Sequence, residues 1–257
     1  MSSLTPSRTE RLASLRAEVR AIESVGCGET RDCLAFGVDA IDRRLAGGGL
    51  AVPGLHEIAG AGPGLSDDAA ATLFLAGIGA RLGGGKGIVL WALSRRDLFA
   101  PGLAQAGLGP DRVLYAECRG DEEVLAVMEE GLRHRGLVAV VGEVGRAAMA
   151  SSRRLQLASE EGGTAALMLK RWRKADADPL AEPSAAVTRW RIAPAPSSPL
   201  PVEGIGRPRW RVTLARQRGG ESFELLMEGT DAQGRLALPA QPRDRPDQAA
   251  GTRQVAA

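Results

Sequence analysis

Residues 54–82 read GLHEIAGAGPGLSDDAAATLFLAGIGARL. They join a short apolar run, a glycine-rich loop and a longer run in which apolar residues recur at helical spacing. We therefore predict a buried strand over 55–59 and a helix over 67–82. A glycine-rich loop between a strand and a helix can hold phosphate groups, because the free N–H groups at the start of the helix point at the anion. The stretch favours an α/β fold and raises the question of a nucleotide site.

Strands and helices continue to alternate on the C-terminal side of this stretch. The continuous apolar run over 87–93 predicts a strand buried on both faces, and we predict further strands over 112–118, 137–144 and 164–172. The segments between them predict helices over 121–135 and 151–162, and a helical segment over 96–107 that Pro101 and Gly102 bend or break. This order of elements is typical of a mostly parallel sheet with helices on both faces.

The pattern changes after a polar loop at 174–186. Apolar and charged side chains alternate in three later segments, 187–195, 209–218 and 222–229. This alternation predicts a C-terminal extension of half-buried antiparallel strands, with Trp190 and Ile192 facing the core. Four arginines are expected on the outward face: Arg189, Arg191, Arg209 and Arg211. Like charges on one sheet face repel each other unless an acidic group such as Glu224, DNA or a partner neutralises them.

The two ends of the chain differ from this core. Residues 8–24 carry an apolar stripe at helical spacing, Leu12, Leu15, Val19 and Ile22. This stripe predicts an amphipathic helix that packs either on the protein's own core or on another subunit. From about residue 238 the chain is rich in Pro, Gln, Arg and Asp, and we predict a disordered tail. We therefore divide the chain into an N-terminal arm (1–30), a core (31–230) and a tail (231–257).

The composition is that of an ordinary globular protein, with 44% apolar and 25% charged residues in 257. No apolar run approaches the roughly 20 residues of a membrane span, and no secretory signal is evident, so we expect a cytoplasmic protein. Three cysteines without a CxxC pair favour free thiols over a metal site. The net charge is only +2, but residues 151–218 hold 13 basic and 6 acidic side chains, which indicates a basic face.

The glycine-rich loop lacks the groups that a nucleoside triphosphatase needs. If the phosphate-loop motif GxxxxGK followed by Ser or Thr is aligned from Gly60, Ser66 takes the lysine position and Asp67 the hydroxyl position. Alignment from Gly62 supplies no lysine either. We expect Ser66, Asp67 and Asp68 to cap the helix instead. A carboxylate there would repel a phosphate about 4 Å away by roughly 4 kcal/mol.

A residual nucleotide site would be formed by Gly60, Gly62, Gly64, Ser66, Asp67 and Glu143. Glu143 follows a strong apolar strand and is the candidate to hold Mg²⁺, although it is shifted by one residue from the usual place of such an acid. Because no lysine is present, we expect neither an ATP nor a magnesium cofactor, and no catalytic residue. His56 and His134 are isolated and are assigned no catalysis.

Five phrases in this order carry a resemblance to a known family: HEIAGAGPG, SRRDLFAPGLAQAGL, VVGEVGRAAMASSRRLQLA, TRWRIAPAPS and RWRVTLARQRGG. Together with FGVDAIDRRLAGGGL before the loop, they resemble a RecA-type ATPase core and, more closely, the inducible-mutagenesis protein A (ImuA) family. The resemblance implies a RecA-like fold and a role in damage-induced, error-prone DNA synthesis. The implied partners are RecA, an inactive Y-family-like polymerase subunit and an error-prone replicative-type polymerase.

Three functions remain open on the sequence. The first is a non-catalytic adaptor that bridges RecA and a mutagenic polymerase complex, and the second is an active ATPase that remodels RecA filaments. The third is a module that binds single-stranded DNA directly, for which the candidate contacts are Arg171, Trp172, Arg173 and Lys174 together with the four outward arginines. The alternative for Trp172 is a partly buried position at the end of a strand. The missing lysine favours the adaptor.

Overall fold

The computed structural model describes residues 32–197 and 204–239. The predicted amphipathic helix with Leu12, Leu15, Val19 and Ile22 therefore lies outside the described residues, as does the end of the predicted tail. Residues 231–239 are described, and they pack on the core: Leu236 is buried, and Ala237 forms a bridge with Glu228. The packed part of the chain thus extends beyond the boundary predicted at residue 230.

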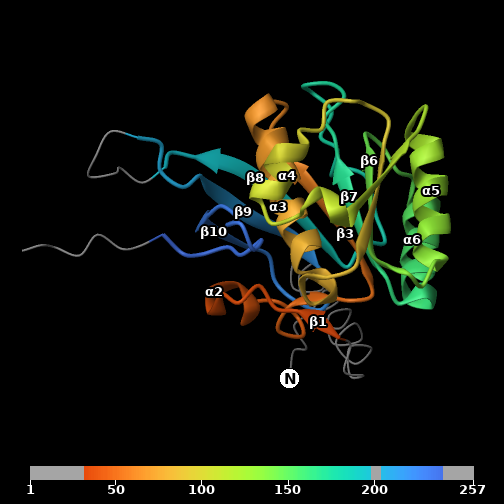
Figure 1. The fold of residues 1–257 in the computed structure, drawn as a ribbon, viewed down its shortest axis with the longest axis horizontal. Helices are drawn as coiled ribbons and strands as arrows, with labels where there is room; N and C mark the ends of the chain where they lie inside the picture. The colour runs from red at the N-terminus through yellow and green to blue at the C-terminus, as the bar shows by residue number, and fades with distance from the viewer. Residues whose placement is uncertain (1–31, 198–203, 240–257) are drawn as a thin grey trace, which may run out of the picture.

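The described chain is an α/β structure built on one eight-stranded sheet (Figure 1). The parallel strands are β3 (Gly54–Gly60), β4 (Ile88–Leu93), β5 (Val113–Glu117), β6 (Leu137–Val144) and β7 (Ala165–Lys170). The C-terminal strands are β8 (Thr188–Ala195), β9 (Arg209–Gln217) and β10 (Phe223–Glu228). The spatial order is β10-β9-β8-β3-β7-β6-β4-β5, so β3 lies in the middle of the sheet.

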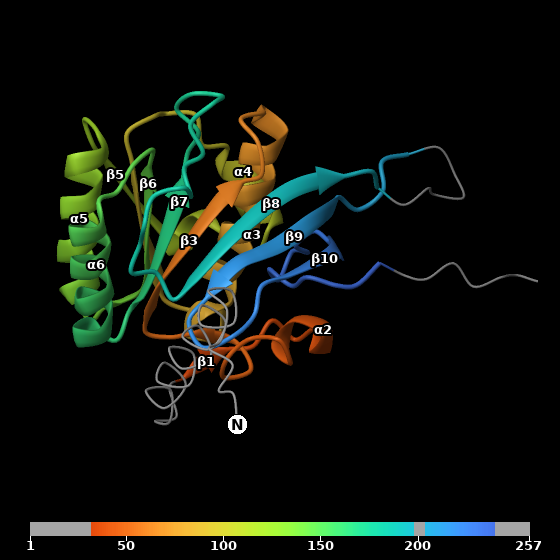
Figure 2. The same cartoon turned by 180° about the vertical axis from the view of Figure 1, so that it is seen from behind.

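Helices cover both faces of the parallel part of the sheet (Figures 1 and 2). On one face lie α3 (Leu65–Arg81) and the short α4 (Ala100–Gln105), and on the other lie α5 (Asp121–Arg133) and α6 (Met149–Gly162). The remaining elements are short: β1 (Cys33–Leu34), α2 (Asp39–Asp42), β2 (Leu50–Ala51), η1 (Leu82–Gly85) and η2 (Pro110–Arg112). The prediction of a mostly parallel, helix-covered sheet with an antiparallel C-terminal part is confirmed.

Two hydrophobic clusters hold these layers together. The larger one lies between the sheet and α3 and contains Phe74 and Trp190, whose ring centroids are 5.6 Å apart. The smaller one lies under α5 and α6 and contains Met128 and Met168. Because the sheet is apolar on both faces in its central strands, the carboxyl ends of those strands are fixed relative to one another. This rigid edge carries the glycine-rich loop.

Three local predictions need correction. Strand β8 is antiparallel only to β9; it runs parallel to β3, so it joins the parallel part of the sheet to the antiparallel part. Arg189, predicted to face outward, is buried, because the loop that precedes β8 covers that side chain. The predicted helix over 96–107 is shortened to Ala100–Gln105, with Pro101 in its first turn, where proline is tolerated.

No helix within 32–197 or 204–239 combines the length and apolar character needed to cross a bilayer.

Candidate functional site

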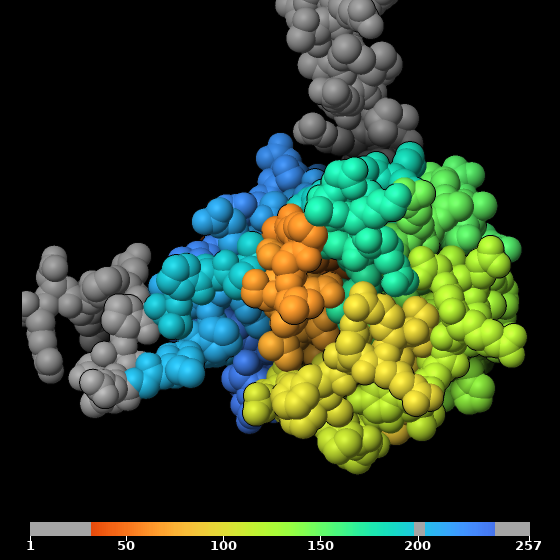
Figure 3. All heavy atoms as spheres, turned by 90° about the horizontal axis from the view of Figure 1, so that it is seen from above, coloured from red at the N-terminus to blue at the C-terminus, as the bar shows by residue number. Residues whose placement is uncertain are grey.

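The glycine-rich loop leaves the end of β3 and enters α3 directly. The space-filling view shows this stretch (orange) at the surface between the segment after β7 (teal) and the segment around α4 (yellow; Figure 3). The helix begins at Leu65 after Gly64, and no side chain forms a capping hydrogen bond there. The prediction that Ser66, Asp67 and Asp68 cap the helix is therefore wrong in its mechanism, although both aspartates lie in the first turn.

Asp67 lies against the loop glycines. A Cβ atom placed on Gly64 would come within 2.9 Å of Asp67 Oδ2, and one placed on Gly60 would come within 2.9 Å of the Asp67 Cβ. The nearest heavy atom to a Cβ on Gly62 would also be Asp67 Oδ2, at 3.6 Å. The glycines thus make room for a carboxylate of the protein itself. An anionic ligand in this loop would meet that carboxylate.

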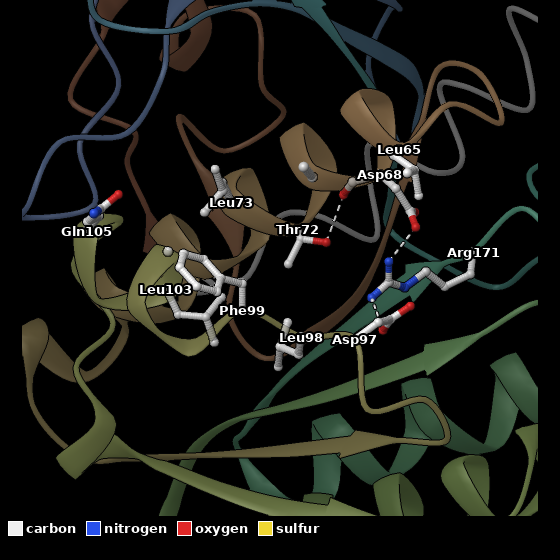
Figure 4. A pocket seen from close by; sticks show the side chains of 12 residues that line it. Leu65, Asp68, Thr72, Leu73, Asp97, Leu98, Phe99, Leu103, Gln105 and Arg171 are labelled. Carbon is white, nitrogen blue, oxygen red and sulfur yellow. Dashed lines mark hydrogen bonds and ion pairs between the residues drawn. The ribbon is translucent and has the colours of Figure 1, made fainter.

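Arg171 is the centre of the site, and it lies after β7 rather than in the glycine-rich loop or α3. It follows β7, its backbone N–H donates to Val144 O at 2.8 Å, and its side chain is 7% exposed. Its Nε and Nη2 donate to Glu143 Oε2 at 3.0 and 2.7 Å, and its Nη1 donates to Asp68 Oδ2. Asp97 Oδ1 lies 3.5 Å from Nη2 (Figure 4). One guanidinium therefore joins carboxylates from α3, β6 and the segment before α4.

Glu143 is fully engaged by protein groups. Its Oε2 accepts from Arg171, and its Oε1 accepts from Trp91 Nε1 at 2.7 Å, a donor on the neighbouring strand β4. Burial raises the pKa of Glu143, while the charge of Arg171 and the hydrogen bond from Trp91 act in the opposite direction. Both carboxylate oxygens have partners, so Glu143 is not placed to hold the Mg²⁺ for which it is the candidate in the sequence.

These contacts decide whether a nucleoside triphosphate and Mg²⁺ fit the site. The loop carries no cation, Asp67 lies against its glycines, and the nearby cation Arg171 is already bound by carboxylates. Trp172 Nε1 donates to Gly60 O at 2.9 Å and so ties the end of β7 to the loop. The residues present therefore do not fit a nucleoside triphosphate with Mg²⁺. Within the described part of the chain, no group of three or more His, Cys, Asp or Glu side chains is placed to hold a metal ion.

The residues that the sequence proposed for contacts with DNA or a partner differ in burial and in the partners that they already have. Arg171 is buried, and Trp172 is half-buried with its indole N–H bonded to the loop, so neither is free to contact nucleic acid. Arg189 is also buried and donates to Glu57 Oε2 at 2.7 Å. Arg173 is exposed but pairs with Asp121 at 2.6 Å, and Lys174 is exposed.

The remaining arginines lie on the outward face of the C-terminal strands, as predicted. Arg209 and Arg211 are directly opposite Ala195 and Ala193 rather than opposite another arginine. Arg211 Nε lies 3.5 Å from Glu224 Oε1, which confirms the internal partner suggested by the sequence. Arg209 donates to Pro196 O at 2.6 Å, and Arg191 pairs with Asp178. Asp178 and Glu224 thus neutralise part of the charge on this face, and Arg209 hydrogen-bonds to a backbone carbonyl.

Sequence reasoning missed the acidic partners of Arg171 and the role of Trp91. Asp68 and Arg171 are 103 positions apart, and they meet only because β3 and β7 are neighbours in the sheet. The one available signal was the concentration of polar residues just after the carboxyl ends of the predicted strands, where ligand sites of α/β proteins form.

Comparisons with known proteins agree with the resemblance seen in the sequence. No protein-family model matches the chain. Proteins named ImuA from two strains of Caulobacter vibrioides are each 39% identical to it over 208 residues, a match that covers 77% of this chain and 84% of each relative. An identity of this size over most of both chains is far above what the fold alone would give. The chain therefore belongs to the ImuA family of damage-induced mutagenesis proteins.

Proposed function

We propose that this protein is a non-catalytic adaptor in damage-induced, error-prone DNA synthesis. In this role it would bridge RecA and a mutagenic polymerase complex that contains an inactive Y-family-like subunit and an error-prone replicative-type polymerase, and it would act in the cytoplasm. Membership of the ImuA family supports a role in damage-induced mutagenesis. The carboxylate of Asp67 against the glycine-rich loop, and the pairing of Arg171 with carboxylates, support the non-catalytic role.

The observation that carries the proposal is the bridge formed by Arg171. In an ATPase of this general plan, a lysine in the loop neutralises the β- and γ-phosphates, and an acid at the end of a strand helps to hold Mg²⁺. Here the cation at the loop is Arg171, and its charge is already balanced by Glu143 and Asp68. A nucleotide would have to displace these carboxylates while Asp67 repels it.

A titration tests the non-catalytic role directly. We expect no binding of a fluorescent ATP analogue with Mg²⁺ to the purified protein up to millimolar concentration, and no competition by unlabelled ATP, with RecA as the positive control. Tight, competable binding would refute the proposal and favour the ATPase.

A second experiment tests the bridging role. The purified protein is mixed with RecA and, separately, with the inactive Y-family-like polymerase subunit, and each mixture is analysed by size exclusion. In each of the two mixtures, we expect the protein to elute in a complex with the partner that is present. If the protein binds neither partner but binds single-stranded DNA with a steep salt dependence, the adaptor is wrong and the DNA-binding alternative holds.

A further inference from the structure

An apolar cavity of about 310 Å³ lies between the first turns of α3 and the segment that contains α4 (Figure 4). Its apolar lining comes from Leu65, Leu73, Leu98, Phe99 and Leu103. Two of these side chains are largely open to solvent: Leu65 is 87% exposed and Phe99 is 68% exposed. Large apolar groups exposed together at a hollow indicate a binding surface, because their exposure is unfavourable unless something covers them.

The polar side of the cavity carries excess negative charge. The charged side chains that line it are the carboxylates of Asp68 and Asp97 and the guanidinium of Arg171. The buried carboxylate of Glu143 lies behind Arg171, and Arg95 pairs with Asp97, so the whole ion-pair network holds three carboxylates and two guanidinium groups. Asp68 Oδ1 is buried and has no hydrogen-bond partner among the residues that the structure describes. Asp97 is the most exposed of these acids, with a side chain that is 40% exposed; its Oδ1 lies 3.5 Å from Arg171 Nη2 and its Oδ2 lies 3.2 Å from Arg95 Nε. The cavity therefore offers an apolar interior with an acidic rim.

We propose that this cavity is the docking site for a segment of a partner protein that presents a bulky apolar side chain next to a lysine or arginine. The apolar side chain would enter between Leu73 and Phe99, and the cation would lie beside Asp97. This inference rests on the proposed adaptor function, since it names the chemistry of one partner that the adaptor would hold. The volume is at the lower end of ligand pockets, roughly 300–1,000 Å³, which suits one or two side chains.

The charge of the site decides against two other classes of ligand. A nucleic acid would place phosphates beside an acidic rim, and Coulomb repulsion would oppose it. A nucleotide would meet both this rim and the carboxylate of Asp67 in the adjoining loop. An apolar anchor with an adjacent cation satisfies both the exposed apolar groups and the unbalanced charge. Such anchors in small pockets carry most of the binding energy of many protein interfaces.

Binding of three matched peptides to the full-length protein tests the proposal. The peptides are heptamers that differ only in whether a central Phe is flanked by Lys, Gln or Glu, and each carries a fluorophore for anisotropy measurements. We expect the Lys-flanked peptide to bind at least tenfold more tightly than the Glu-flanked one. Asp97→Asn should reduce this preference, because it removes the accessible charge. Equal binding of all three peptides, or binding of none, would overturn the proposal.

Two lysine substitutions on neighbouring helices provide the matched control. Ala69 is exposed on α3 and lines the cavity, whereas Ala104 is exposed on α4 and does not line it. Both tolerate lysine, which forms helices well. Ala69→Lys fills the cavity and supplies its own cation, so we expect it to weaken the Lys-flanked peptide at least tenfold, whereas Ala104→Lys should bind it like the wild type. Equal effects of the two substitutions would show that the peptide binds elsewhere.

The outcomes also separate this inference from the adaptor function. If the peptides fail to bind but the protein still co-elutes with RecA and the polymerase subunit, the cavity is not the docking site, and the adaptor function stands. If the protein forms a dimer that Ala69→Lys disrupts, the occupant is a second copy, and the assignment to a separate partner is wrong. If the protein neither co-elutes with RecA and the polymerase subunit nor binds the peptides, both the adaptor function and the docking site in the cavity are refuted.

Discussion

Truncation of Arg171 should destabilise the protein strongly. The side chain is 7% exposed and pairs with Glu143, which is 3% exposed, so Arg171→Ala would leave a buried carboxylate without its cation. Breaking a buried ion pair in this way costs about 3–5 kcal/mol. For a domain of this size, each kcal/mol lowers the melting temperature by about 2–4 °C, which predicts a decrease of about 6–20 °C.

Urea and thermal unfolding followed by circular dichroism would measure this effect. Arg191→Ala is the matched control, because Arg191 also pairs with an aspartate, but the two side chains are 27% and 34% exposed. A pair of this kind contributes about 1 kcal/mol or less. If the two variants lost the same free energy of unfolding to within about 1 kcal/mol, Arg171 would not behave as the cation of a buried ion pair. The conclusion that it holds Glu143 and Asp68 together beside the glycine-rich loop would then be refuted.

Three further predictions concern the framework around the site. Burial lowers the pKa of His56 from 6.5 to about 4, against the raising effect of its hydrogen bond to Ala51 O. Because the unfolded chain binds a proton that the folded protein excludes, the free energy of unfolding should fall by about 2 kcal/mol from pH 7 to pH 5. His56→Gln should remove that dependence, and an unchanged pH profile of stability would contradict the assignment. A Cβ on Gly162 would lie 1.8 Å from the Leu132 carbonyl oxygen, so Gly162→Ala should cost at least about 1–3 kcal/mol in urea unfolding, whereas Gly163→Asn, at an open position with φ +70°, should cost much less. The Arg112 guanidinium donates to the carbonyl of Ala80 in the last turn of α3 and to those of Lys86 and Gly87 after it, and Arg112→Ala should cost about 2 kcal/mol by the same assay; a loss below about 0.5 kcal/mol would show that water replaces these bonds.

The sequence allowed the layers of the fold to be predicted, because each depends on local pattern. Continuous apolar runs identified β4, β6 and β7, and alternation identified β9 and β10. Alternation also showed correctly that Arg189 and Trp190 point to opposite sides of β8. It could not show that the loop before β8 folds over the Arg189 side, where Ser184 donates to Glu57 and so helps to bury the arginine.

The candidate site was predicted only in part. The missing lysine and the acidic residues of the loop were visible in the sequence, because they are consecutive. The bridge by Arg171 depends on which strands are neighbours in the sheet, and no local pattern encodes that order. For the same reason, Trp172 was considered as a stacking residue for DNA, whereas its indole N–H bonds to Gly60 O across 112 positions.

The bridge by Arg171 has a consequence for the evolution of this family member. Restoring a lysine at Ser66 would add a second cation to a site where Asp67 remains against the loop and Arg171 still binds Glu143 and Asp68. An ATP site would require coordinated changes in the loop, in α3 and at the end of β7, and the single change Arg171→Ala is predicted to be strongly destabilising. A single point mutation would therefore not turn this loop into an ATP site, because Asp67 and the carboxylates that bind Arg171 would remain in place.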